Sequence, residues 1–137
     1  MKHFFLDTNI VIDVLTDRKP FSELGQKLFD LSLNGKIKLS ISSLSYTTIY
    51  YYIRKSTGSH KSAMTILKEL EVIIEPSDVS KEMINKALHS EFNDFEDAVQ
   101  YFTALSVNCD GIITRNPKDF KSSLILILSP QEALALI

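Results

Sequence analysis

The sequence predicts an α/β protein, a three-layer α/β/α sandwich with a mostly parallel sheet of about five strands. Short apolar segments of strand length alternate along the chain with longer segments in which apolar residues recur at the helical period. No hairpin turn dipeptide separates two strand-like segments, so helices connect the strands and cover both faces of the sheet. With 137 residues, the chain is expected to form a single domain, 1–137, around one core.

Five segments are predicted to be strands because they are short, apolar and bounded by polar or turn residues. They are His3–Leu6, Lys38–Ser42, Glu71–Glu75, Gly111–Thr114 and Leu124–Leu128. Helices are predicted over Asn9–Leu15, Phe21–Asn34, Ser43–Lys55, Ser59–Leu70, about 78–90, and Asp94–Val107, with a short helix starting at Ser129-Pro130. Because two helices precede the third strand, at least one connection is a helical pair.

Composition and charge indicate an ordinary globular protein. The chain is 45% hydrophobic and 23% charged, and none of its apolar runs approaches the length of a membrane span. Its net charge of −2 argues against a protein that coats nucleic acid, but an acidic metal site in a nuclease is compatible with it. The lone Cys109 excludes an internal disulfide, and the N-terminus enters a strand without a signal-peptide pattern. We therefore expect a cytoplasmic protein that does not enter a membrane.

Four aspartates lie next to predicted strand ends in three distant segments. Asp7 ends the first strand, Asp94 and Asp97 lie three residues apart at a helix start, and Asp119 follows the strand 111–114. Carboxyl ends of neighbouring parallel strands converge on one crevice. Carboxylates gathered there repel one another unless a hard divalent cation neutralises them. The sequence therefore predicts a metal-dependent hydrolytic site, with Mg²⁺ or Mn²⁺ as the suited ions.

Each aspartate also has a structural alternative. Asp7 is a good helix N-cap, and Asp94 with an acidic residue three positions later imitates a capping box. For Asp94 and Asp97, capping and metal binding are equally supported, and one carboxylate can cap while the other faces a metal. Asp119 follows the turn residues Asn116-Pro117, so turn stabilisation is its alternative role.

Taken in order, four motifs resemble those of the PIN domain family, in the form found among bacterial VapC-like proteins. They are Leu6-Asp7-Thr8-Asn9, Asp94-Phe95-Glu96-Asp97-Ala98, Ile113–Phe120, and Leu128–Glu132. The resemblance covers essentially the whole chain. It implies a metal-dependent ribonuclease that cuts RNA, is commonly a homodimer, and is often the toxin paired with an antitoxin protein.

The resemblance also implies roles for individual residues. Asp7 and Asp97 would be the principal metal ligands, with Asp119 as the third and Asp94 nearby. The supporting positions would be Thr8, Asn9, Thr114 and Asn116. A basic cluster flanks Asp119, and two of its members, Arg115 and Lys118, are expected to hold the RNA backbone; Lys121 is the third member.

One position departs from the family pattern. The second motif places a Glu in the helix after the second strand, where this chain has Thr48. A hydroxyl brings no negative charge to a cation, so we expect a lower affinity for metal. Two alternatives therefore stay open. The chain could be a weakened PIN domain that binds RNA or protein, or, less favoured, a haloacid-dehalogenase-like phosphatase, whose second aspartate is replaced here by Asn9.

Overall fold

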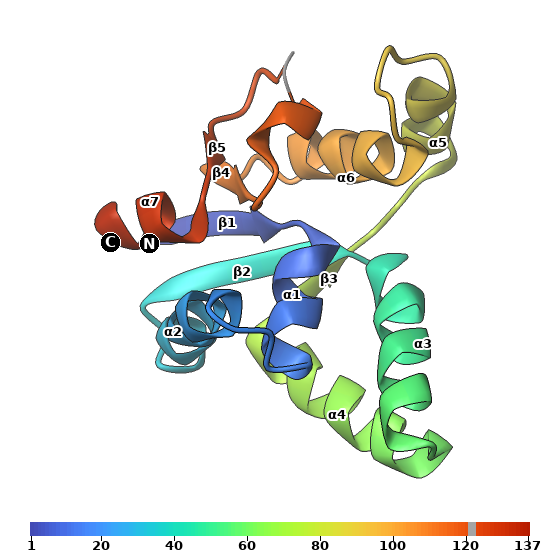
Figure 1. The fold of residues 1–137 in the computed structure, drawn as a ribbon. Helices are drawn as coiled ribbons and strands as arrows, with labels where there is room; N and C mark the ends of the chain where they lie inside the picture. Colours follow the sequence, from blue (N-terminus) through green and yellow to red (C-terminus); the bar gives the residue numbers. More distant parts are fainter. Residues whose placement is uncertain (121–122) are drawn as a thin grey trace.

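The computed structural model describes residues 1–120 and 123–137, which form a five-stranded, fully parallel sheet between two layers of helices (Figure 1). The strand order is β3-β2-β1-β4-β5. The strands are β1 (Lys2–Leu6), β2 (Ile37–Ser42), β3 (Glu75–Ser77), β4 (Gly111–Ile113) and β5 (Ile127–Leu128). The helices are α1 (Thr8–Leu15), α2 (Phe21–Leu33), α3 (Ser45–Thr57), α4 (His60–Ile73), α5 (Lys81–Leu88), α6 (Phe95–Ser106) and α7 (Pro130–Ala135), with a 3₁₀ turn, η1, at Pro117–Phe120.

The pleat of the central strand divides the core between the two faces of the sheet. Phe4 and Leu6 point into a large apolar cluster with residues of α1, α2, α3, α4 and α7. Phe5 points the other way, into a cluster with Tyr101 of α6 and Phe120 of η1. This period of two residues is what a strand buried on both faces requires. In Figure 1, α1 to α4 accordingly lie on one side of the sheet, and α5 and α6 on the other.

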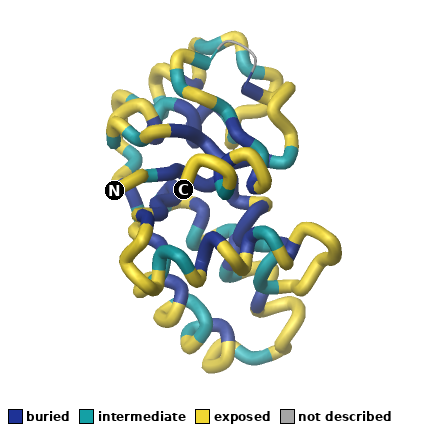
Figure 2. Tube along the Cα trace, turned by 90° about the vertical axis from the view of Figure 1, so that its left-hand side faces the viewer, coloured by how far each residue is buried: buried dark blue, intermediate teal, exposed yellow. Residues whose placement is uncertain are grey.

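Burial follows the same layering. Figure 2 shows buried residues running through the middle of the trace, with exposed residues on the outer turns of the helices. No helix in the described part of the chain is long and apolar enough to cross a membrane.

The predicted fold class is confirmed, with one strand misplaced. The predicted strand at 71–75 is wrong, because α4 continues to Ile73 and β3 occupies Glu75–Ser77. Leu70 and Ile74 are both buried and lie four residues apart, which is a helical spacing. The β-branched run at 72–74 gives the same apolar signal in either conformation. The strand predicted at 124–128 is shorter, since only Ile127–Leu128 pairs with β4.

The order of the strands decides where a site can form. β2 and then β3 lie on one side of β1, and β4 and then β5 lie on the other side. The carboxyl ends of β1 and β4 therefore meet at the point where the strand order reverses, which is the usual ligand position in open α/β sheets. The backbone amide of Asp7 donates to the carbonyl of Ile113 at 3.0 Å, so the residues that follow these two strands are neighbours.

Candidate active site

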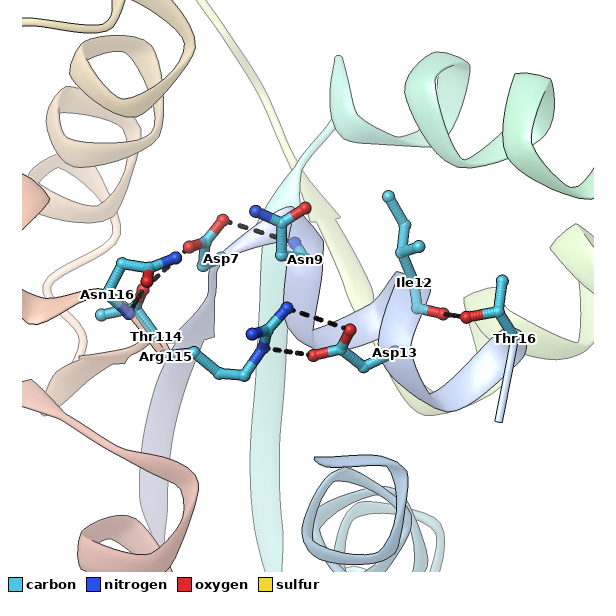
Figure 3. A network of polar contacts seen from close by, with 8 residues as sticks. All are labelled: Asp7, Asn9, Ile12, Asp13, Thr16, Thr114, Arg115 and Asn116. Carbon is cyan, nitrogen blue, oxygen red and sulfur yellow. Dashed lines mark hydrogen bonds and ion pairs between the residues drawn. The ribbon is translucent and has the colours of Figure 1, made fainter. Parts of the chain in front are cut away.

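Asp7 is the buried centre of the site. It follows β1, is 3% exposed, and caps α1 by accepting a bond from the Asn9 amide at 3.4 Å. Its second carboxylate oxygen accepts a 2.8 Å hydrogen bond from the hydroxyl of Thr114, as the close view in Figure 3 shows. Burial raises the pKa of Asp7, while the bonds from Thr114, Asn9 and Gln100 oppose the rise. The capping role is thus confirmed and leaves the carboxylate pointing into the site.

Behind Asp7 lies a buried polar network. The side-chain amide of Gln100, on α6, donates to Asp7 at 3.4 Å, and its oxygen accepts from the Thr8 amide at 2.9 Å. The Thr8 hydroxyl also pairs with the Ser45 hydroxyl at the start of α3, at 2.7 Å. All three partners are buried. The network ties the end of β1 to helices on both faces of the sheet, and so fixes the orientation of Asp7.

The two aspartates at the start of α6 divide their roles. The Asp94 carboxylate accepts a 2.9 Å bond from the Asp97 amide and caps the helix. Asp97, one turn on, is half-buried and faces the site. Burial, followed by the charges of Asp94, Asp7, Asp119 and Glu96, raises the pKa of Asp97 to about 7. The helix start therefore supplies one capping carboxylate and one that is costly to ionise without a cation.

Asp119 lies on η1, which packs on the same face of the sheet as α6. The 3₁₀ turn begins after Thr114 and Asn116, and the Asp119 amide donates to the Asn116 carbonyl at 3.0 Å. The Asn116 amide in turn donates to the Thr114 hydroxyl at 3.0 Å (Figure 3). Asp119 is exposed, and its charge contributes to the raised pKa values of both Asp7 and Asp97. The turn thus places a third, exposed carboxylate at the same cavity as the other two.

These segments enclose a polar cavity of about 290 Å³, which we call the acidic cavity. It is lined by Asp7, Thr8, Asn9, Ile12, Thr48, Tyr52, Asp94, Glu96, Asp97 and Asp119. Five of these residues are carboxylates. Among the described residues, no three His, Cys, Asp or Glu side chains already stand close enough together to hold a metal ion. The carboxylates surround the cavity, as mutual repulsion dictates, and a cation would have to draw them inward.

The sequence interpretation missed three residues of this site: Gln100, Ser45 and Glu96. Gln100 interrupts the buried run Ala98 to Tyr101, and its spacing of three from Asp97 puts both on one side of α6. That isolated polar residue was the available signal. Partial desolvation, then the charges of Asp7 and Asp94, raises the pKa of Glu96.

The two expected substrate-binding cations differ in position. The guanidinium of Arg115 donates to both carboxylate oxygens of Asp13 on α1, at 2.6 and 3.2 Å (Figure 3). It also lies over the ring of Phe21. It does not line the acidic cavity. Lys118 is exposed and lines a second cavity beside the acidic one. Lys121 lies outside the described residues.

Comparison with known proteins agrees with this architecture. Residues 3–118 match the PIN domain family. Ribonuclease VapC1 of Aquifex aeolicus is 30% identical over 133 residues, which cover 93% of this chain and 90% of the relative.

Solved structures share the fold at lower identity. VapBC2 from Rickettsia felis, bound to a DNA fragment from its promoter, superposes with a TM-score of 0.66 at 18% identity, covering 93% of this chain and 98% of that one. VapBC-1 from nontypeable Haemophilus influenzae gives 0.65 at 17% identity, covering 94% and 98%. A toxin–antitoxin complex from Klebsiella pneumoniae gives 0.63 at 20% identity, covering 92% and 96%. With the carboxylates of three motifs gathered around one cavity, these matches show that the chain belongs to the PIN domain family.

Proposed function

We propose that this protein is a metal-dependent ribonuclease that hydrolyses phosphodiester bonds in RNA. The acidic cavity carries the proposal, because five carboxylates surround it and the most buried, Asp7, is held by hydrogen bonds from distant segments. Membership of the PIN domain family and the similarity to a relative named as a ribonuclease support the choice of RNA. The polar lining argues against an apolar small molecule as the substrate.

The donor set fits Mg²⁺ or Mn²⁺. Asp7, Asp97 and Asp119 would hold the ion through carboxylate oxygens, the ligands that hard cations prefer. The raised pKa of Asp97 fits the same assignment, since a nearby cation stabilises its ionised form. When bound, the ion would activate water for attack on the phosphate and neutralise the developing charge. The chain's own contribution is to keep Asp7 oriented and to anchor the start of α6 through Asp94.

The flanking cations have separate roles. Lys118 is exposed beside the three carboxylates that the two cavities share, so its ammonium group is placed to hold the RNA backbone. Arg115 acts through its ion pair with Asp13, which secures the residues after β4 against α1. We assign Arg115 a positioning role and keep direct phosphate contact for Lys118.

Thr48 favours a second candidate function. It lies in the wall of the acidic cavity and adds no charge there. The affinity of the site for a cation should therefore be lower than that of a site with Glu at this position. A PIN domain that binds RNA without cutting it is the alternative. Glu96, in the same cavity, offers a negative charge that offsets the loss.

The proposed partners are an antitoxin protein and a second copy of the chain. Three of the structural neighbours are described as VapBC or toxin–antitoxin complexes, which supports an antitoxin as partner. For the second copy, Leu44 is 49% exposed and Phe95 is 50% exposed, and both line one apolar hollow between α3 and α6. Such an exposed apolar patch is a usual feature of an interface.

The test is cleavage of a panel of structured RNAs by the purified protein with Mg²⁺ or Mn²⁺. The matched variants are Asp7→Asn and Asp97→Asn, with Asp78→Asn as control, because Asp78 is exposed outside the cavity. Metal-dependent cutting that EDTA and both site variants abolish, and that the control retains, is the expected result. Cutting that persists in Asp7→Asn would contradict the site assignment. RNA binding without cleavage by the wild type would favour the binding module.

A further inference from the structure

A second cavity, of about 360 Å³, adjoins the acidic cavity. The two share Asp94, Asp97 and Asp119, so a single wall of carboxylates separates them. Any group bound in the second cavity would therefore lie next to a phosphate bound at the acidic one. The rest of its lining, however, is different in chemistry, and the proposed hydrolysis assigns no role to its aromatic residues or to Asn93.

Aromatic rings form the floor of this second cavity. Phe92, from the loop before α6, lies 5.2 Å from Tyr101 and 6.3 Å from Phe102 between ring centroids. Tyr101 and Phe102 are in edge contact at 5.2 Å. The Tyr101 hydroxyl accepts a 2.9 Å bond from the Leu124 amide, which fixes its ring. The rings are held in place before any ligand arrives, so binding a flat group against them would cost little ordering.

Polar groups occupy the rim. Asn93 is exposed and lines the cavity, and its amide offers both a donor and an acceptor. The exposed carboxylate of Glu91 adds an acceptor, and Lys118 adds a positive charge next to the shared carboxylates. An aromatic floor with a hydrogen-bonding rim suits a heteroaromatic ring, and the cation suits a phosphate attached to it.

We propose that this cavity is a base-binding pocket, which holds the nucleobase of a nucleotide next to the phosphodiester that is cut. The inference rests on the proposed function, since it places the base relative to the acidic cavity. The ring of the base packs against Phe92 and Phe102, the amide of Asn93 bonds its edge, and Lys118 binds its phosphate. The pocket would then select which base occupies that position, a role that the metal-binding carboxylates cannot perform.

Direct binding tests the pocket without requiring cleavage. The ¹⁵N-labelled protein is titrated, in Mg²⁺, with each of the four nucleoside 5′-monophosphates, and separately with ribose 5-phosphate, which has the sugar and phosphate but no base. We expect at least one nucleotide to shift the side-chain amide signal of Asn93 and the backbone signals of Phe92 and Phe102. Ribose 5-phosphate should leave these signals in place. Equal shifts with ribose 5-phosphate, or no shift with any nucleotide, would overturn the pocket.

Two substitutions sharpen the assignment. Phe102→Leu keeps an apolar side chain in the core but removes the ring, and Asn93→Ala removes the rim amide. Each should raise the Kd of the bound nucleotide by roughly fivefold or more, as the loss of one stacking or edge contact predicts. Asn85→Ala is the control, because Asn85 is exposed on α5 and does not line the cavity. Unchanged affinity in both pocket variants would overturn the proposal.

Failure of the pocket and failure of the ribonuclease are distinguishable. Nucleotide binding by the pocket in a protein that cuts no RNA would overturn the ribonuclease while supporting a base-binding site. RNA cleavage that is equally fast in the wild type, Phe102→Leu and Asn93→Ala on substrates varied at each base would support the ribonuclease and overturn the pocket.

Discussion

The hydroxyl of Thr114 donates a 2.8 Å hydrogen bond to the carboxylate of Asp7, across 107 positions of sequence. Both residues are buried, and they follow adjacent parallel strands, β4 and β1. The bond joins the two halves of the sheet at the point where the strand order reverses. It also opposes the rise in the Asp7 pKa that burial causes.

Thr114→Val tests that relationship. The change keeps the shape but leaves one Asp7 oxygen without its donor, so we expect a loss of roughly 1–3 kcal/mol in unfolding free energy. Asp7 should also become harder to ionise, which lowers metal affinity. Urea unfolding and calorimetric Mg²⁺ titration measure the two effects. Thr114→Ser keeps the hydroxyl and should behave like the wild type; equal defects in both variants would point to packing rather than to the hydrogen bond.

The raised pKa of Asp97 predicts how stability without metal depends on pH. In the folded protein this pKa is about 7, against 3.8 for an ordinary Asp, so the folded state holds a proton that the unfolded state has released. Asp97 therefore contributes stability that is fully present below pH 3.8 and is lost as the pH rises through 7. Melting temperatures in EDTA should show this contribution falling across that range.

Asp97→Asn provides the comparison. Because Asn does not titrate, the variant lacks this pH-dependent loss of stability. Its melting temperature should therefore rise relative to that of the wild type as the pH increases toward 7. Saturating Mg²⁺ should reverse the trend for the wild type alone, because the cation binds the ionised carboxylate. A pH-independent difference between the two proteins would contradict the assignment.

Thr48→Glu should restore charge to the acidic cavity. The added carboxylate lines the same space as Asp7 and Asp97, so metal binding should tighten by roughly tenfold, while melting temperature in EDTA falls through repulsion. Isothermal titration with Mn²⁺ measures the affinity. Thr65→Glu, on the exposed side of α4, introduces the same charge outside the cavity and should change neither quantity. Unaltered affinity in Thr48→Glu would show that this wall does not reach the ion.

Substitutions of Arg115 and Lys118 should have different effects, the first on stability and the second on RNA binding. Asp13 is 3% exposed, so Arg115→Ala leaves a buried carboxylate without its partner and should cost about 3 kcal/mol. Lys118→Ala removes an exposed ammonium and should leave unfolding unchanged while it weakens RNA binding and lowers the salt dependence of that binding. Chemical denaturation and fluorescence anisotropy distinguish the two; destabilisation by Lys118→Ala would be the contrary result.

A polar substitution tests the proposed dimer. Leu44→Asp places a charge in the apolar hollow that Phe95 shares, so self-association should weaken at least tenfold in sedimentation or light scattering. Leu88→Asp is matched, since Leu88 is an exposed leucine on α5, outside that hollow. A wild type that is monomeric at high concentration would contradict the dimer itself.

The sequence predicted those parts of the fold and site that depend on local patterns, and it did not predict those that depend on contacts between residues far apart in the chain. The strands β1 and β2, the helices, and the convergence of Asp7, Asp97 and Asp119 follow from local pattern and from the geometry of parallel sheets. The boundary between α4 and β3 could not be predicted in this way. The apolar residues at 72–74 suit either element, and tertiary packing decides which one they join. The polar partners of Asp7 and of Arg115 were not predictable for a related reason. Gln100 and Asp13 are 93 and 102 residues away from them, and no local pattern reports such pairings.

The residues around the acidic cavity are drawn from nearly the full length of the chain, from Asp7 to Asp119 of 137 residues. A polypeptide still being synthesised contains Asp7 before Asp119, and it lacks Asp119 until η1 has been made and has docked. The full set of carboxylates around the acidic cavity therefore exists only after η1 has been synthesised. The same distribution means that a truncated product, ending before Asp119, would have no complete site.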